Sequence, residues 1–352
     1  MSTSTEVNLT ERKVVHDERV KERNRVQRML IRPEMGAGIG AVVIFIFFFV
    51  VAPPFRSAES LATVLYGSST IGIMACAVAV LMIGGEFDLS AGVAVTTGSL
   101  AASMLAWNFH LNLWAGAGLA LILSLAVGFF NGYMVMKTKI PSFLITLGTL
   151  LMLTGANIAV TKWVAGAVAT PSVSDMEGWD SARAVFASTL TVFGVPVRIT
   201  VLWWLLFTVI ATYVLFKTKI GNWIFAVGGD AESARAVGVP VTAVKIGLFM
   251  FVGFAAWFSG MHLLFSYNTV QSGQGVGQEF IYIIAAVIGG CLLTGGYGTA
   301  IGAAIGAFIF GMVQQGIVYA GWEPDWFKFF MGVMLLFAVI ANNAFRNYAA
   351  KR

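Results

Sequence analysis

Ten runs of apolar residues, each of spanning or near-spanning length for a lipid bilayer, follow one another along this chain. A helix needs about 20 consecutive apolar residues to cross the hydrocarbon core of a membrane. Of the 352 residues, 58% are hydrophobic and 11% are charged, a composition that a water-soluble domain would not tolerate. The sequence therefore predicts an all-α membrane protein with about ten transmembrane helices. The runs cover residues 36–55, 61–83, 90–106, 113–136, 140–161, 199–216, 243–266, 279–293, 299–320 and 327–343.

The distribution of basic residues predicts that both ends of the chain lie in the cytoplasm. Lys and Arg concentrate in cytoplasmic loops of membrane proteins. If the polar tail 1–35 is cytoplasmic and each run crosses once, 17 of the 22 Lys and Arg residues fall in cytoplasmic segments or at their borders. The tail lacks the pattern of a cleavable signal peptide, so we expect it to stay attached. The transmembrane domain then covers 36–343, and a cytoplasmic tail follows at 344–352.

Two stretches between the apolar runs are too polar to be inserted in the membrane. Residues 162–198 are expected outside, with enough Trp, Phe and Val to lie at the membrane surface. Residues 217–242 are expected in the cytoplasm. Both are candidate docking surfaces, because loops carry function more often than the elements they connect.

Residues suited to metal binding or catalysis are scarce. Cys76 and Cys291 lie far apart inside apolar runs, and the three histidines do not have the spacing of a metal site. The chain has no GxxxxGKS or GxxxxGKT loop, so it does not bind ATP by that route. We therefore expect no metal ion, no cofactor bound by this chain, no nucleic-acid partner and no enzymatic activity of its own.

The stretch GGEFDLSAG, residues 84–92, places two carboxylates between two apolar runs. A carboxylate in hydrocarbon is costly, so Glu86 and Asp88 must face protein or water. In one interpretation Asp88 caps the helix that starts near residue 90. In the other, the break borders a passage or gate near the cytoplasmic side. The two interpretations are compatible, and we keep both.

A second motif is a ladder of glycines at Gly298, Gly302 and Gly306. Such a ladder gives a helix one face with almost no side chains, so another backbone can approach closely. The first expectation is packing within the helix bundle, and the alternative is a pore-lining or dimer-contact role. The glycine-rich sequence around residue 300 also resembles the one around residue 90, which suggests an internal repeat.

Residues 230–238, DAESARAVG, carry the marks of a short helix between two apolar runs. Acidic residues stand at its start, Arg235 stands near its end, and Gly238 and Pro240 terminate it. A helix this short is marginal alone in water, so it either needs a partner surface or is an ordinary loop helix.

Four motifs give the chain a resemblance to the permease subunits of bacterial ATP-binding-cassette importers for simple sugars, the ribose-type group. They are GGEFDLSAG (84–92), NGYMVMKTKIPSFLITLGTLLMLTGA (131–156), VGGDAESARAVGVPV (227–241) and IGGCLLTGGYGTAIGAAIGA (288–307). The resemblance covers about residues 60–343. Related permeases import branched-chain amino acids or nucleosides. The sequence departs from the family at Glu86, where a small or aliphatic residue is common, and in its long N-terminal tail.

The resemblance implies a permease dimer in the lipid of the bacterial cytoplasmic membrane, most simply a homodimer. It also implies a separate ATPase subunit, which carries ATP and Mg, and a soluble substrate-binding protein. The coupling helix that docks into the ATPase would then comprise Asp230, Ala231, Glu232, Ser233, Ala234, Arg235 and Gly238.

Candidates for the lining of the substrate pathway are Asp88, Asn131, Thr146, Thr149 and Asn157. For each Thr, a bond back to its own helix carbonyl is an equal alternative. Besides a permease for branched-chain amino acids or nucleosides, the rival functions are an ion-coupled carrier, which would depend on Glu86 or Asp88, and a membrane enzyme or scaffold.

Overall fold

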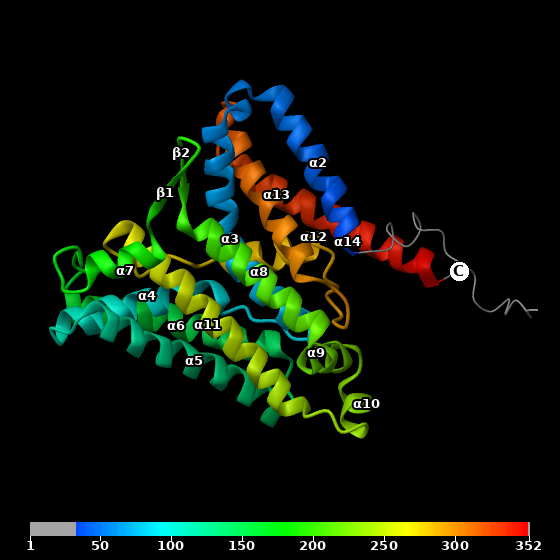
Figure 1. Ribbon diagram of the computed structural model, residues 1–352. Coiled ribbons are helices and arrows are strands. Elements are labelled where there is room, and N and C mark those ends of the chain that lie inside the picture. The colour runs from blue at the N-terminus through cyan, green and yellow to red at the C-terminus, as the bar shows by residue number, and fades with distance from the viewer. Residues whose placement is uncertain (1–32, 351–352) are drawn as a thin grey trace, which may run out of the picture. The chain divides into compact units, whose positions relative to one another are not determined.

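The computed structural model describes the backbone of residues 33–350 and the side chains of residues 34–340. Most of the predicted tail 1–35, and the side chains of 344–352, lie outside the described residues. The described chain is almost entirely helical (Figure 1). A mostly helical fold is therefore confirmed.

Each of the ten apolar runs lies on a helix. Seven of these helices, within the described residues, are long and apolar enough to cross a membrane. Helix α4 has 18 residues but is not among the seven, and α12 has only 11 residues. The count of ten crossings therefore remains a prediction. The helices are α2 (Pro33–Val51), α3 (Ala58–Ile83), α4 (Ala91–Asn108), α5 (Leu113–Thr138), α6 (Ser142–Ala165), α8 (Ile199–Lys217), α11 (Val241–Tyr267), α12 (Gln278–Ile288), α13 (Ala300–Tyr319) and α14 (Trp326–Ala350).

Helix α3 forms the centre of the bundle. It packs against α8, α11, α12 and α13, and 78% of its membrane window is buried inside the chain, compared with 11% for α2. Helix α5 runs along α11 (Figure 1), and Gly128 and Gly132 make this approach possible. A Cβ on Gly132 would lie 2.7 Å from the Cα of Ile246. The core is therefore built by small residues that let helix backbones come close.

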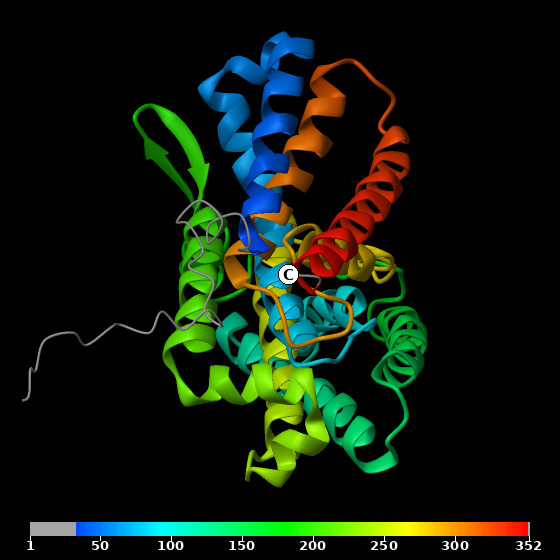
Figure 2. The ribbon, with the colours of Figure 1, turned by 90° about the vertical axis from the view of Figure 1, so that its right-hand side faces the viewer.

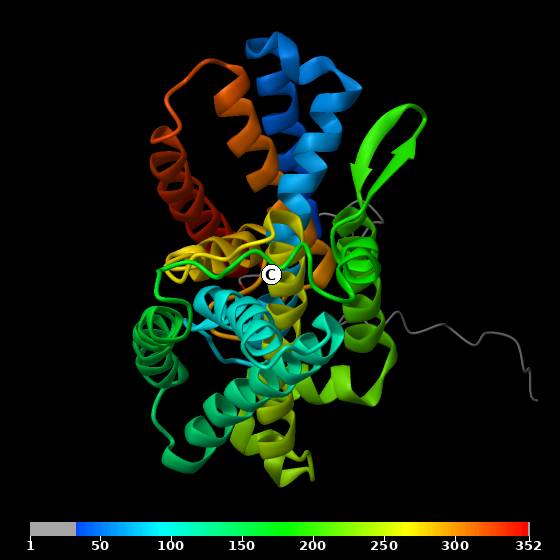
Figure 3. The same ribbon diagram turned by 90° about the vertical axis from the view of Figure 1, so that its left-hand side faces the viewer.

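The polar stretch after α6 contains structure that the sequence did not predict. It holds helix α7 (Trp179–Phe186) and an antiparallel hairpin of β1 (Thr189–Val192) and β2 (Val195–Arg198). The hairpin turns through Phe193 and Gly194, both with positive φ, the geometry of a tight two-residue turn. Strand β2 packs against α3, and Figures 2 and 3 show the tip of the hairpin projecting from the bundle.

Backbone hydrogen bonds tie this stretch to two other loops. The Leu113 N–H donates to the Glu177 carbonyl at 2.9 Å, and the Thr170 N–H donates to the Val270 carbonyl at 3.0 Å. The loops before α5 and after α11 therefore lie on the same side of the molecule as residues 166–198. The predicted topology assigns all three to the outside.

Two of the three ladder glycines lie on α13, and the third does not. Gly302 and Gly306 face α12, where an added Cβ would collide with the carbonyl oxygens of Gly289 and Ala285. Gly298 precedes the helix, in the loop between α12 and α13, with a φ of 148°. The expected ladder on one helix face is thus shorter than predicted. Its contacts within the described chain are those of packing between α12 and α13.

Candidate functional site

The chain breaks between α3 and α4 at residues 84–90, as the sequence predicted. Helix α3 ends at Ile83, and Gly85 turns the chain with a φ of 82°. That conformation suits glycine, because other residues would bring their Cβ against the backbone. The break is buried within the bundle, with Glu86 7% exposed and Asp88 3% exposed. Both carboxylates face protein.

Asp88 holds the residue that precedes α4, and it does not cap the helix itself. Its Oδ1 accepts hydrogen bonds from the Ser90 N–H at 2.8 Å and from the Ser90 hydroxyl at 2.6 Å. Ser90 is the residue before α4, and no side chain caps that helix start. The capping interpretation correctly places Asp88 at the start of α4, but Asp88 bonds Ser90 and not an N–H group within the helix.

From Ser90 a chain of hydrogen bonds runs into α5 and α6. The Asn131 Nδ2 donates to the Ser90 hydroxyl at 3.0 Å, and the Thr149 hydroxyl donates to Asn131 Oδ1 at 2.7 Å. Four of the five pathway candidates, Asp88, Asn131, Thr146 and Thr149, thus lie around the break. Asn157 lies apart, where its Oδ1 accepts from Thr97 at 3.1 Å.

The break's own backbone is held by hydroxyls of α6. The Phe87 N–H donates to the Ser142 hydroxyl and the Leu89 N–H to the Thr146 hydroxyl, each at 3.0 Å. The Thr146 hydroxyl in turn donates to the Ser142 carbonyl at 2.9 Å, so it bonds back to its own helix as well. All five pathway candidates are buried, and for the four that lie around the break the geometry favours a role in holding it against α5 and α6. Their contact with a solute remains a prediction.

Glu86 forms an ion pair with Lys245 in the first turns of α11. The side chains are 9% and 14% exposed, and this is the only ion pair among the described residues. A charge this buried is costly unless it is paired. The unusual acid of the motif therefore has a partner 159 residues away, on the helix that follows the short helix expected at residues 230–238.

The short helix is present as α10 (Ala231–Ala236), preceded by α9 (Lys219–Gly229). Asp230 accepts a hydrogen bond from the Ser233 N–H at 2.7 Å, and this bond holds the pKa of Asp230 below its ordinary value. Ala234 is buried and anchors the helix, whereas Glu232 and Arg235 are exposed. Helix α10 thus presents a charged face that the described chain does not cover. Figure 1 shows it at the lower end of the molecule, beside the start of α11.

Three segments meet at a set of four glycines that we call the glycine junction: Gly85, Gly228, Gly295 and Gly296. The Gly296 N–H donates to the Ile83 carbonyl at 2.8 Å. A Cβ on Gly228 would lie 2.7 Å from the Gly296 nitrogen and would also collide with the Ile83 carbonyl. A Cβ on Gly295 would lie 2.7 Å from the Cα of Gly85. The end of α9 therefore touches both the break after α3 and the loop before α13, backbone to backbone.

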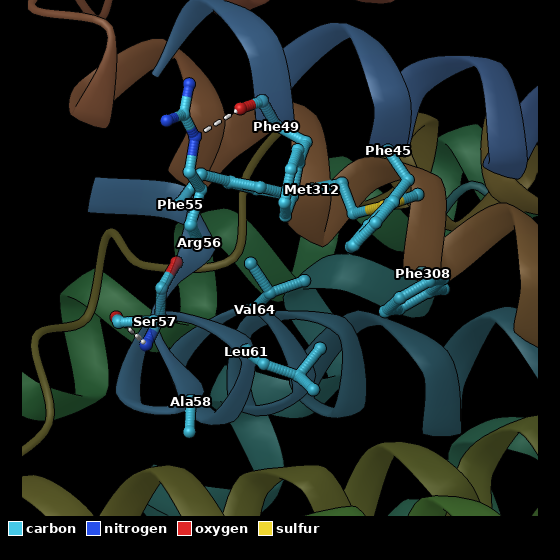
Figure 4. A pocket seen from close by; sticks show the side chains of 11 residues that line it. Phe45, Phe49, Phe55, Arg56, Ser57, Ala58, Leu61, Val64, Phe308 and Met312 are labelled. Atoms are coloured by element: carbon cyan, nitrogen blue, oxygen red, sulfur yellow. Dashed lines mark hydrogen bonds between the residues drawn. The ribbon is translucent and has the colours of Figure 1, made fainter. Parts of the chain in front are cut away.

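A separate pocket of about 260 Å³ lies between α2, α3, α13 and the 3-10 helix η1 (Pro53–Arg56) (Figure 4). Its wall is mostly apolar, and Arg56 at its edge donates to the Phe49 carbonyl at 2.7 Å. The pocket suits an apolar group better than a hydroxylated solute. The described residues contain no cluster of His, Cys, Asp or Glu that could hold a metal ion.

The family model for the branched-chain amino acid transport system permease component matches residues 60–339. The chain belongs to this family. With seven apolar helices of spanning length among its described residues, the permease is a multi-pass protein of the bacterial cytoplasmic membrane. The resemblance noted in the sequence is confirmed.

The permease is similar to three import permeases along most of its length. It is 28% identical to the ribose import permease protein of Escherichia coli K12, over 87% of this chain and 92% of that protein. It is 30% identical to the galactose/methyl galactoside import permease protein of the same strain, over 85% and 90%. It is 26% identical to the fructose import permease protein of Rhizobium meliloti, over 84% and 81%. None of the solved structures matches the permease.

Sequence reasoning missed the partner of Glu86 and the glycine junction. In the sequence, Lys245 is only one more basic residue near the start of an apolar run. The junction did leave a signal, because a Gly-Gly pair occurs in each of the three segments, at 84–85, 228–229 and 295–296.

Proposed function

We propose that this chain is the membrane-spanning subunit of an ATP-driven importer that moves a monosaccharide or a similar polyol. The observation that carries the proposal is the set of relatives, which are import permeases for ribose, galactose and fructose and align with at least 84% of this chain. In keeping with this substrate class, the polar groups of the membrane helices are mainly Ser, Thr and Asn. The pathway would need only such groups, because a neutral polyol requires hydrogen bonds and no ion pair.

The proposal includes partners that carry the energy and the affinity. A separate ATPase subunit binds ATP and Mg and docks against α10 through Glu232 and Arg235. A soluble binding protein delivers the solute at the opposite side, and a second permease copy completes the passage. The proposed topology has ten crossings with both chain ends in the cytoplasm. The exposed charged face of α10 supports this docking, because a helix of six residues needs a partner surface to stay rigid.

Import of a branched-chain amino acid is the second candidate, and the family's description favours it. A zwitterionic solute needs fixed groups for its ammonium and its carboxylate. The buried acids near the pathway candidates are Asp88, which is bonded to Ser90, Glu86, which is paired with Lys245, and Glu279, which accepts from the Gly277 N–H. Lys245, the basic partner beside them, is already engaged by Glu86, which leaves the carboxylate of a zwitterion without a partner there, so the sugar proposal fits better.

The test is purification of the tagged chain from its own membranes in mild detergent. We expect an ATPase at about one copy per permease, and we expect it to be lost when Glu232 and Arg235 are both replaced by Ala. Val237→Ala serves as a neutral control at the same helix, because it removes no charge. A chain that purifies without an ATPase and takes up solute under a proton or sodium gradient alone would show that the proposal is wrong.

A further inference from the structure

Two contacts hold the break at residues 84–90. One comes from the segment that precedes the proposed coupling helix α10, and the other from the segment that follows it. On one side, Gly228 at the end of α9 lies against Gly85, and a Cβ on Gly85 would lie 3.3 Å from the Gly228 Cα. On the other side, Lys245 in the first turns of α11 pairs with Glu86. Helix α10 lies between these two attachment points in the chain. Neither attachment has a flexible side chain that reaches into solvent.

Two different kinds of contact make these attachments. The glycine contact joins backbones, so it transmits a push but offers little resistance to a pull. The ion pair is buried, so separating it would expose two charges to an apolar surrounding, which is costly. Together they restrain the break in both directions relative to the α9–α10–α11 segment.

From the break, the hydrogen bonds described above continue into the bundle. Asp88 fixes Ser90, Ser90 accepts from Asn131 on α5, and Asn131 accepts from Thr149 on α6. The backbone of the break is also bonded directly to α6 through Ser142 and Thr146. A displacement of the break therefore displaces α4, α5 and α6 with it.

We propose that the Glu86–Lys245 ion pair is the link that converts a movement of α10 into a movement of the helix break. Glu86 and Lys245 are positioning residues: they touch neither solute nor nucleotide. The inference rests on the proposed docking of an ATPase at α10. Loss of the pair leaves α10 free to dock, and it leaves the glycine contact and the packing of α11 on α4 and α5 in place. It removes the bond between α11 and the break itself, so more ATP is hydrolysed for each solute imported.

The experiment uses the complex purified from its own membranes and reconstituted in liposomes with its ATPase and binding protein. Labelled ribose, galactose and fructose serve as probes, and the readout is solute imported per ATP hydrolysed. The variants are Lys245→Met, Glu86→Gln, the double variant of both, and the exchange of Glu86→Lys with Lys245→Glu. Lys137→Met is the matched control, because Lys137 is an exposed lysine near the end of α5.

We expect the two single variants and the double variant to keep the ATPase bound, with import per ATP reduced about tenfold, the size of a typical coupling between sites. The exchanged pair should recover most of the ratio, and the control should equal the wild type. The double variant leaves no buried charge alone, so it tests the link even if a single variant fails to accumulate.

Three results would overturn the inference. In the first, the double variant imports as much per ATP as the wild type while the ATPase stays bound; this leaves the proposed function intact. In the second, the exchanged pair is as impaired as the single variants, which means that the site needs these residues for packing and not for the link. In the third, the wild-type chain binds no ATPase, and the proposed function fails together with the inference.

Discussion

The contact of Gly228 with its neighbours can be tested by adding one methyl group. In Gly228→Ala, the new Cβ lies 2.7 Å from the Gly296 nitrogen and closer still to the Ile83 carbonyl oxygen. Ordinary contacts of this kind begin at 3.4 Å, so the Gly296 backbone must withdraw by about 0.7 Å and the Ile83 carbonyl by more than that. Both neighbours are backbone atoms in a buried junction, and they have no side chain that can rotate away.

The next residue provides a matched control. Gly229 is on the same helix, and a Cβ there meets nothing within 4 Å. Both substitutions gain the same helix propensity, about 1 kcal/mol. The difference between the two variants therefore isolates the packing cost, about 1–3 kcal/mol for a group forced into a filled site. If the packing cost displaces the break, the import rates of Gly228→Ala and Gly229→Ala should differ roughly 5- to 150-fold.

The assay is uptake of labelled sugar by cells or vesicles with equal amounts of each variant in the membrane. Gly228→Ala should import at least fivefold less than Gly229→Ala, and Gly229→Ala should match the wild type. Co-purification of the ATPase reports whether α10 still docks. Equal uptake by the two variants at equal abundance would refute the reasoning, because it would mean that separating the backbones at the glycine junction does not affect import.

Two further predictions concern the same bundle. Asp88→Ala should lower uptake more than Ser90→Ala, because it leaves the buried backbone N–H of Ser90 without its acceptor, at a cost of about 1–3 kcal/mol. Ser90→Ala removes the two bonds of the hydroxyl, with Asp88 and Asn131, but keeps the N–H of residue 90 bonded to Asp88. Equal and negligible effects on uptake and abundance would contradict this. Gly306→Ala should lower the melting temperature of the detergent-purified chain by several degrees, because the new Cβ collides with the Ala285 carbonyl. Gly148→Ala is the control and should leave the melting temperature unchanged, because a Cβ there meets nothing within 4 Å. Equal melting temperatures of the two variants would argue against close packing of α12 on α13.

The sequence was sufficient for the helices of the ten apolar runs and for the location of the break, but not for α7 or α9. Apolar runs can be read directly because bilayer thickness sets their length, and every one of them contains a helix. The short helix after Asp230 was also predictable, because its cap and its stop are local signals. The hairpin at residues 189–198 was missed, since two strands of four residues carry too little periodicity to be recognised.

The arrangement of the site was harder to predict, because it depends on contacts between distant segments. Nothing local in the sequence pairs Glu86 with Lys245, and a lysine at a helix start is ordinary near a membrane surface. The burial of Asn131 could not be predicted from the sequence either, since a polar residue on a membrane helix can face a passage or a neighbouring helix. Its Gly128 and Gly132 neighbours, which pack against α11, explain why this face of α5 is covered.

The enclosure of α3 has a consequence for how the protein is made. Its apolar residues are surrounded by helices and not by lipid, and its neighbour α13 begins 217 residues after α3 ends. A ribosome adds about 5–20 residues per second, so roughly 10–40 seconds separate the synthesis of the two helices. During that interval α3 must remain in the bilayer or with the insertion machinery. Its hydrophobicity keeps it stable in lipid until the helices that cover it in the finished protein have been made. Chains truncated before α13 should consequently insert in the membrane but remain substrates for its proteases.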